Sequence, residues 1–347
     1  HAEDGLSPGL TDGDIVGYVR LGNDLSENYY QIEIPLKKSS SGSLNPQAVW
    51  PLVNEINLPI SALEAIKSHA IFNGTLGSQD ATFYNVINDI VSEEPVDEFS
   101  EHDLGQHRIA IKGNPNFGDI RALMVGVKNP RQDNMNVCAE VWFNELRLSD
   151  MDNKGGWAAT LALDSNIADF MTISATGRQS TNGFGSIEQG PSERDKIDKK
   201  QYDVVSNINV GQLFPKKWGL NIPFNYGQGE ELITPEYDQQ YRDIKLNSRL
   251  DAAETQEDKN NILQQSEDYT KRKSINLIGV SKQKTGDSEP RFYDIENFTF
   301  NYSYNQIEHR DYEIESMLDQ NIRAGASYNF NFNSPKLEPF KNNDSLF

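Results

Sequence analysis

Histidine and cysteine bind transition metals and act as catalytic bases and nucleophiles, and the chain has few of either. Its histidines are His1, His69, His102, His107 and His309, and Cys138 is its single cysteine. No histidine lies in an HExxH motif or four residues from another, which is the spacing of a helical zinc site. One cysteine cannot form an intrachain disulfide, and a lone cysteine is most often a small buried hydrophobic residue. The sequence therefore predicts no transition-metal site.

Motifs for nucleophilic catalysis and for phosphate binding are missing as well. The chain has no GxSxG elbow, no GxxxxGK[ST] loop and no GxGxxG turn. Gly183-Phe184-Gly185 lacks the third glycine and the strand-to-helix setting of a dinucleotide site, so it predicts a turn or a kink in a strand. We therefore expect neither an enzyme nor a bound cofactor.

Carboxylates are abundant, with 52 acidic residues in the chain. Neighbouring pairs such as Glu93-Glu94 and Glu230-Glu231 arise by chance at this density, and a solvated face is their simplest explanation. Oxygen-rich loops suit Ca²⁺. The sequence leaves a calcium site open, without the spacing of an EF-hand, at three aspartates: Asp12, Asp14 and Asp24.

The composition is that of an acidic, aromatic-rich chain of 347 residues, a length that suggests about two domains. With 52 acidic and 32 basic residues the net charge is -20, which disfavours binding to a phosphate backbone. The 16 Phe, 14 Tyr and 4 Trp are too many for a disordered chain. No run approaches the ~20 apolar residues of a membrane-spanning helix. We expect an internal piece of a longer protein, because the chain starts at His1 without a signal peptide and residues 334–347 complete no recognisable element.

Residues 1–150 combine short strands with turn-rich loops. Ser61–Ser68 predicts a short helix with Ser61 and Glu64 as a capping box, and the acidic stretch Ser92–Asp103 predicts a solvated loop. In the last strand the apolar set changes phase at Asn144-Glu145, as at a β-bulge. Five stretches rich in β-branched and aromatic residues predict the strands of a jelly-roll-like β-sandwich: Asp14–Leu21, Tyr29–Leu36, His107–Lys112, Arg121–Val127 and Glu140–Leu148.

From Gly155 onward apolar and polar residues alternate with a period of two, so each predicted strand has one apolar and one polar face. The two most regular strands begin at Asn297 and at Ile322. The other strands of this kind lie within residues 157–164, 171–176, 202–213, 220–226 and 274–280.

Two surroundings explain such strands. In a soluble sandwich the apolar face packs against a second sheet, whereas in an outer-membrane barrel it faces lipid and the polar face lines a wet lumen. The polar face here carries Asn, Ser, Thr and Gly with little charge, and aromatic residues such as Trp157, Trp218, Tyr226 and Tyr328 gather at strand ends. The two best strands also approach the ~9–11 residues of a tilted spanning strand. These features favour the barrel.

About seven such strands are too few for a self-contained barrel, because bacterial single-chain barrels start at eight strands and have even numbers. The sequence therefore predicts an all-β chain in four parts. They are a jelly-roll-like extramembrane domain at 1–150, antiparallel strands of a large, incomplete transmembrane β-barrel at 151–242 and 273–347, and a polar helical extramembrane insertion at 243–272.

A series of short motifs runs through residues 10–335. They are Tyr18–Asp24, Asn28–Leu36, Val49–Asn54, Gly113–Pro115, Val125–Pro130, Glu140–Asp150, Gly155–Ala159, Gly183–Glu188 and Phe214–Tyr226. Together they resemble the SprA/Sov family, the outer-membrane translocons of the type IX secretion system, whose members are far longer than this chain.

This resemblance implies a segment of a very large barrel in the cell outer membrane that exports folded proteins, with a role in gliding motility where that occurs. The implied partners are cargo proteins with a C-terminal sorting domain, a lateral-gate barrel of the PorV type, a periplasmic plug protein and membrane lipids, but no nucleic acid. The family offers no catalytic residues to carry over.

A lumen lined with amides and hydroxyls would let a folded cargo pass without adhering to it. The candidates for the lumen face are Asn297, Asn301, Asn305, Asn329 and Asn331. The candidates for the lipid face are Phe298, Phe300, Tyr302, Tyr328, Phe330 and Phe332.

Two other classes of protein remain as alternatives. One is a secreted carbohydrate-binding or adhesin-type β protein, with a soluble β domain after the jelly roll. The other is a glycoside hydrolase with an accessory jelly roll, which requires two carboxylates facing one cleft.

Overall fold

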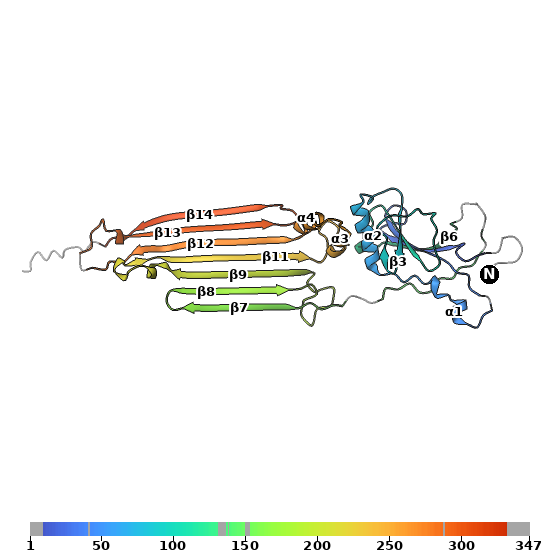
Figure 1. Ribbon diagram of the computed structural model, residues 1–347, viewed down its shortest axis with the longest axis horizontal. Helices are drawn as coiled ribbons and strands as arrows, with labels where there is room; N and C mark the ends of the chain where they lie inside the picture. The colour runs from blue at the N-terminus through green and yellow to red at the C-terminus, as the bar shows by residue number, and fades with distance from the viewer. Residues whose placement is uncertain are drawn as a thin grey trace, which may run out of the picture. The chain divides into compact units, whose positions relative to one another are not determined.

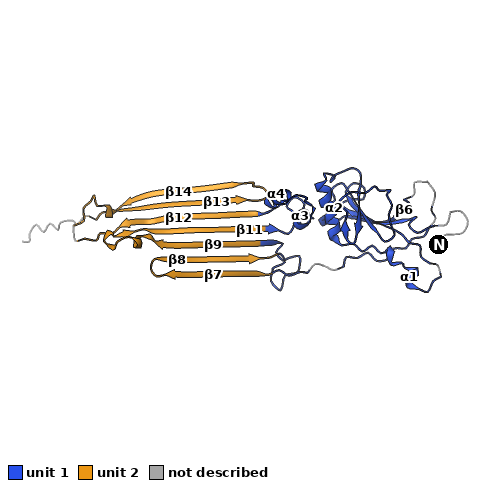
Figure 2. Cartoon of the chain, in the orientation of Figure 1, with its two compact units in different colours: residues 1–156, 182–198, 234–267 blue, residues 157–181, 199–233, 268–347 orange. Residues whose placement is uncertain are grey.

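Two antiparallel sheets dominate the computed structural model, which describes residues 10–40, 42–130, 137, 139–149, 153–286 and 289–331. The chain is all-β, as the sequence predicts. It divides into two compact units, each assembled from several stretches (Figure 2). The first unit contains residues 1–156, 182–198 and 234–267, and the second contains residues 157–181, 199–233 and 268–347. No helix in the described ranges has the length and apolar character needed to cross a membrane.

The first unit contains a six-stranded sheet with the strand order β4-β3-β5-β2-β1-β6 (Figure 1). Every neighbouring pair in it is antiparallel. Its strands are β1 (Val16–Gly22), β2 (Tyr29–Pro35), β3 (Thr82–Ile87), β4 (Ile90–Val91), β5 (His107–Lys112) and β6 (Ala122–Lys128). Its helices are α1 (Pro46–Val49), α2 (Ile60–Phe72), α3 (Leu246–Ala252) and α4 (Gln256–Ser266).

Helix α2 supplies the apolar side chains that cover one face of this sheet. Leu63 and Ile66 of α2 lie in one buried cluster with Tyr30, Tyr84 and Ile109 of the strands. Burying a side chain the size of Ile66 contributes about 1.5–3 kcal/mol to folding. In the described residues the layer facing the sheet is therefore a helix, and the jelly-roll-like arrangement of residues 1–150 stays a prediction.

Two local predictions for this unit are wrong. The N-cap of α2 is Pro59, without a side-chain cap, so Ser61 and Glu64 do not form a capping box. Residues 140–148 form no strand, and Glu145, where the bulge is predicted, has a φ of 53°. A strand needs a hydrogen-bonded neighbour as well as an apolar pattern, and no described strand pairs with this segment. Strands β3 and β4 were not among the predicted elements.

The acidic residues 92–103 form an irregular loop, as predicted, and Arg108 of β5 fixes its conformation. The Arg108 guanidinium is buried and donates to the carbonyl oxygens of Glu98, Ser100 and Glu101 at 3.0, 3.3 and 2.9 Å. It also donates to Asn85 Oδ1 at 3.2 Å. The loop backbone is thus organised by one cation rather than by solvent alone.

His102 makes this loop sensitive to acid. The pKa of His102 is lowered from 6.5 to about 4, chiefly by burial and to a smaller degree by the charge of Arg108, against the opposing hydrogen bond to the Gln106 carbonyl at 2.8 Å. An unfolded histidine binds its proton near pH 6.5. Between pH 6.5 and 4 the unfolded state therefore binds more protons than the folded state, and the stability of the loop falls as the pH falls. After allowance for the solvent contact of His102, we expect a loss of ~1–2 kcal/mol.

Hydrogen exchange of residues 96–106 in the full chain measures this loss. We expect exchange to accelerate between pH 6.5 and 4, after correction for the intrinsic rate, and His102→Gln to flatten the dependence because glutamine does not titrate. The same profile in both proteins would assign the acid sensitivity to another group.

The second unit contains long strands in the order β14-β13-β12-β11-β9-β8-β7, and the short β10 pairs with β12 (Figure 1). The strands are β7 (Ala158–Ile167), β8 (Met171–Ser180), β9 (Ile197–Asn209), β10 (Leu220–Asn221), β11 (Pro223–Pro235), β12 (Asp268–Lys282), β13 (Phe298–Arg310) and β14 (Met317–Tyr328). Apart from β10, they have 10 to 15 residues, about twice the ordinary ~5–6. Among the described strands, β7 and β14 end the order, so the sheet does not close on itself.

Candidate functional site

The candidate site is the long-stranded sheet of the second unit, whose register sorts side chains onto two faces. Tyr302 of β13 pairs with Ala324 of β14 and with Leu277 of β12, and Leu277 pairs with Phe224 of β11. Paired residues of neighbouring strands point to the same side of a sheet. One apolar row therefore crosses four strands, and Ile322, Tyr304, Ile275 and Tyr226 form the next row.

A bulge keeps this face apolar along β12. The register between β12 and β13 shifts between Ile278, which lies opposite Asn301, and Val280, so that Val280 rather than Gly279 lies opposite Phe300. Gly279, between them, has a φ of 81°, a conformation that glycine adopts without the steric cost of a Cβ. The extra residue restores the phase of the apolar set.

Four of the candidates for a lipid face, Phe298, Phe300, Tyr302 and Tyr328, share one face of β13 and β14. Phe298 pairs with Tyr328, and their rings lie 5.1 Å apart. Phe298 and Phe300 stack with their centroids 6.4 Å apart, and Phe300, Tyr302 and Tyr328 are exposed. Phe330 follows β14, and Phe332 lies outside the described residues. Contact of this face with lipid stays a prediction.

The asparagine candidates divide into two groups. Asn301 and Asn305 lie on β13, on the face opposite Phe300 and Tyr302. Asn301 Oδ1 accepts a hydrogen bond from Gly279 N at 2.8 Å. Asn305 Nδ2 donates a hydrogen bond to Ser303 Oγ at 3.1 Å. Asn297 instead ends a short 3-10 turn, where its Nδ2 donates to the carbonyl oxygens of Arg291 and Phe292 at 2.8 and 3.2 Å. Asn329 and Asn331 follow β14, which ends at Tyr328.

An amide ladder on the polar face includes functional candidates that sequence reasoning missed. Ser303 Oγ donates to Asn276 Oδ1 at 2.8 Å, and Asn276 Nδ2 donates to Asn225 Oδ1 at 3.1 Å. Asn225 Nδ2 donates to Asn207 Oδ1 at 2.7 Å, and Asn207 Nδ2 donates to Thr172 Oγ1 at 3.3 Å. The ladder thus crosses β13, β12, β11, β9 and β8. Each asparagine stands in an alternating strand, but only the register shows that they share a row.

A belt of tyrosines and glutamines on the apolar face was also missed. Tyr226 Oη donates to Gln228 Oε1 at 2.8 Å, and Gln228 Nε2 donates to Tyr202 Oη at 3.1 Å. Gln320 Nε2 likewise donates to Tyr304 Oη at 3.1 Å. Each of these tyrosine hydroxyls therefore forms a hydrogen bond with a glutamine side chain, while the tyrosine ring lies on the apolar face. Tyrosine places an apolar ring and a polar tip in this way at the edge of an apolar surface.

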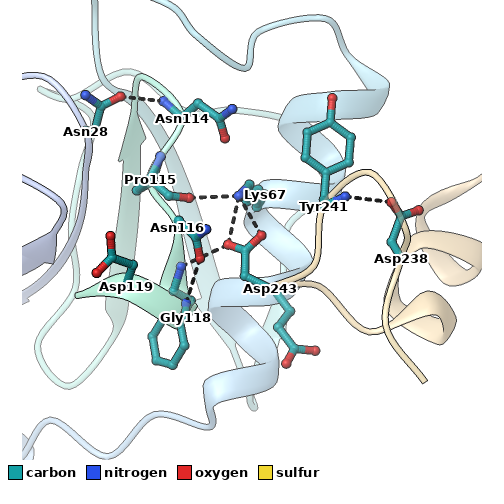
Figure 3. A network of polar contacts seen from close by, with 12 residues as sticks. Asn28, Lys67, Asn114, Pro115, Asn116, Gly118, Asp119, Asp238, Tyr241 and Asp243 are labelled. Carbon is teal, nitrogen blue, oxygen red and sulfur yellow. Dashed lines mark hydrogen bonds and ion pairs between the residues drawn. The ribbon is translucent and has the colours of Figure 1, made fainter. Parts of the chain in front are cut away.

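Lys67 and Asp243 form the centre of a separate polar network, in the first unit (Figure 3). Lys67 Nζ donates to the Pro115 carbonyl at 2.8 Å and to the two carboxylate oxygens of Asp243 at 2.9 and 2.8 Å. Asp243 Oδ2 also accepts from Phe117 N at 2.9 Å. The two side chains are only 2% and 4% exposed. Burial lowers the pKa of Lys67, and Asp243 opposes that shift.

This network holds the segment between β11 and β12 against helix α2. Asp243 precedes helix α3, and Ser248 within α3 donates to Glu64 of α2 at 3.1 Å. Burial raises the pKa of Glu64, whereas the bond from Ser248 lowers it. The helices α3 and α4 lie within the range where the sequence predicts a polar helical insertion.

The carboxylate oxygens of the three aspartates considered for calcium accept hydrogen bonds from different groups of the chain. Asp24 Oδ1 accepts from the backbone N–H groups of Ser26, Glu27 and Asn28, at 2.9, 2.5 and 3.0 Å. Asp12 accepts from the backbone of Lys38, and Asp14 from Thr11. Within the described ranges, no three His, Cys, Asp or Glu side chains gather in a group that could hold a metal ion. The position of Cys138 lies outside the described residues.

The fold and the site define an all-β protein whose long antiparallel strands carry an aromatic face and an amide-lined face. The family of motility related/secretion proteins, SprA_N, has a model that matches residues 1–250. The chain belongs to this family, as its motifs predict. The family is described by secretion and motility rather than by a catalysed reaction. No curated protein gives a significant match to the chain.

Proposed function

We propose that the second unit is part of the wall of a large outer-membrane β-barrel, the translocon of the type IX secretion system. Its strands would cross the cell outer membrane, and the full translocon would export folded cargo with a C-terminal sorting domain and serve gliding motility where that occurs. A PorV-type lateral-gate barrel, a periplasmic plug and membrane lipids would be its partners.

The observation that supports this proposal most strongly is the exposure of an apolar face along strands of spanning length. Leu161 of β7 is 74% exposed, Leu163 is 57% exposed and Ile322 of β14 is 64% exposed. In water such a face favours aggregation, whereas against hydrocarbon it is the face a barrel requires. With 10 to 15 residues, the long strands reach or exceed the ~9–11 residues that a tilted spanning strand needs.

The opposite face supports the transport part of the proposal. Its row of Asn207, Asn225, Asn276 and Ser303 is neutral, and its hydrogen bonds run from side chain to side chain. These four side chains offer a passing folded protein no fixed charge to adhere to. The open edges at β7 and β14 agree with a barrel completed by further strands, since an unpaired edge in hydrocarbon is costly.

The secreted proteome of the parent organism tests this function. Deleting the parent gene should remove proteins with the C-terminal sorting domain from the medium and accumulate them in the periplasm, and restoring the intact gene should reverse both effects. Proteins exported by other routes provide the internal control. Unchanged secretion of sorting-domain proteins would overturn the transport role, whatever the sheet does in the membrane.

A further inference from the structure

A trough on the polar face of the second unit lies along the amide ladder. It has a volume of about 600 Å³, which falls within the ~300–1,000 Å³ of small-molecule sites. Six of its lining residues are asparagines: Asn166, Asn207, Asn209, Asn221, Asn225 and Asn276. Asp169 is the single charged residue among the lining residues, and Phe170 adds an aromatic ring.

The ladder leaves hydrogen-bonding capacity for a ligand. A carboxamide has two N–H donors and an oxygen with two lone pairs. Asn225 uses one donor toward Asn207 and one lone pair toward Asn276, so one of each remains. Asn166 and Asn209 make no side-chain hydrogen bond within the described part of the chain, and both line the trough. The floor thus offers both donors and acceptors.

The head-to-tail order of the ladder fixes the position of these groups. Ser303, Asn276, Asn225 and Asn207 each donate in the same direction across the sheet. Chains of hydrogen bonds in one direction polarise and strengthen one another. A site whose polar groups are already oriented binds its ligand with less ordering cost.

We propose that this trough binds a neutral oligosaccharide. A sugar hydroxyl both donates and accepts, which matches the unused N–H and lone pair of each carboxamide, and an aromatic ring such as Phe170 suits the apolar face of a pyranose. The carboxamides repeat at the strand spacing of ~4.8 Å, whereas an extended peptide repeats its pattern every two residues, ~6.6–6.8 Å. Successive pyranose rings advance by about one strand spacing, so a glycan lying across the strands matches the ladder better than a peptide does. The carboxylate of Asp169 disfavours an anionic glycan.

Titration calorimetry with the full chain in detergent micelles tests this site. The probes are maltotetraose, cellotetraose and chitotetraose, with tetragalacturonate as the anionic comparison. We expect at least one neutral tetrasaccharide to bind and tetragalacturonate to bind at least ten-fold more weakly. Asn225→Ala should weaken the neutral ligand at least ten-fold and Asn209→Ala several-fold. Asn321→Ala, on the same face but outside the trough, should leave the affinity unchanged.

A second measurement covers the case in which a variant fails to fold. With the wild-type chain labelled in its asparagine side chains, the bound sugar should shift the carboxamide signals of a small subset of asparagines. The proposal is overturned if none of the three neutral sugars binds, if the anionic sugar binds as tightly, or if Asn321→Ala reduces binding as much as Asn225→Ala. These outcomes are independent of secretion, so they are separable from a failure of the proposed transport role.

Discussion

Phe300→Lys is expected to abolish accumulation of the parent protein in the outer membrane, whereas Asn301→Lys is expected to leave most of it in place. Phe300 is 46% exposed on the apolar face, and the adjacent Asn301 lies on the opposite face. A lysine facing lipid costs ~2–4 kcal/mol at the midplane of a barrel and less toward the strand end, where Phe300 is the third residue of β13, while the same residue facing a wet lumen costs little. Asn301→Lys still loses the bond to Gly279 N, worth ~1 kcal/mol.

Membrane fractionation with immunodetection of the parent protein measures this difference. The two substitutions introduce the same charge at neighbouring positions, so each is the matched control of the other. We expect the Phe300 variant to fall at least ten-fold below the Asn301 variant. Equal amounts in the outer membrane would show that the aromatic face does not contact lipid, and the proposed barrel wall would lose its main support.

Lys67→Met should destabilise the first unit by ~3–5 kcal/mol, because it leaves the Asp243 carboxylate buried without its cation. Asp243→Leu should cost a similar amount by stranding the ammonium of Lys67. Together, Lys67→Met and Asp243→Leu should cost less than either substitution alone, since the double variant buries no charge. Lys67 and Asp243 are 176 residues apart in the sequence. Loss of the pair should therefore first weaken the contact between helix α2 and the segment that contains Asp243.

Hydrogen exchange of residues 243–266 in the full chain measures the effect on helices α3 and α4. Both single variants should accelerate exchange there, while the strands of the second unit stay protected. Arg121→Met serves as the control, because the Arg121–Asp119 pair at 2.7 Å is exposed and contributes less than ~1 kcal/mol. If Lys67→Met behaves like Arg121→Met, the buried pair does not hold the segment.

The long strands were predictable because the signal for them is local. Residues 298–305 of β13 and 322–328 of β14 alternate apolar and polar side chains, and this alternation alone places Phe300 and Asn301 on opposite faces. A helix was also predicted at Ser61–Ser68, and α2 covers this range, although the capping box on which the prediction rested does not form. In these elements, the pattern that predicts the secondary structure spans only a few consecutive residues.

The remaining features depend on partners that are distant in the sequence. Glu140–Leu148 has a strand pattern but no described neighbour, so it forms no strand. The contact between Asn207 and Asn225 depends on the register between β9 and β11, and a slip of one residue would move either side chain to the other face. The pairing of Lys67 with Asp243 follows only from the three-dimensional fold. Sequence patterns predicted many of the elements, though not β3 and β4, and could not predict these contacts between them.

The assembly of the first unit from three stretches of chain bears on how its gene can change. A recombination break after the codon for Gly156 would transfer Lys67 without Asp243, and the recipient would inherit a domain with an unmatched buried cation. A transfer that preserves the domain has to carry β7 through β11 with it. We therefore expect this domain and these strands to be inherited as one block.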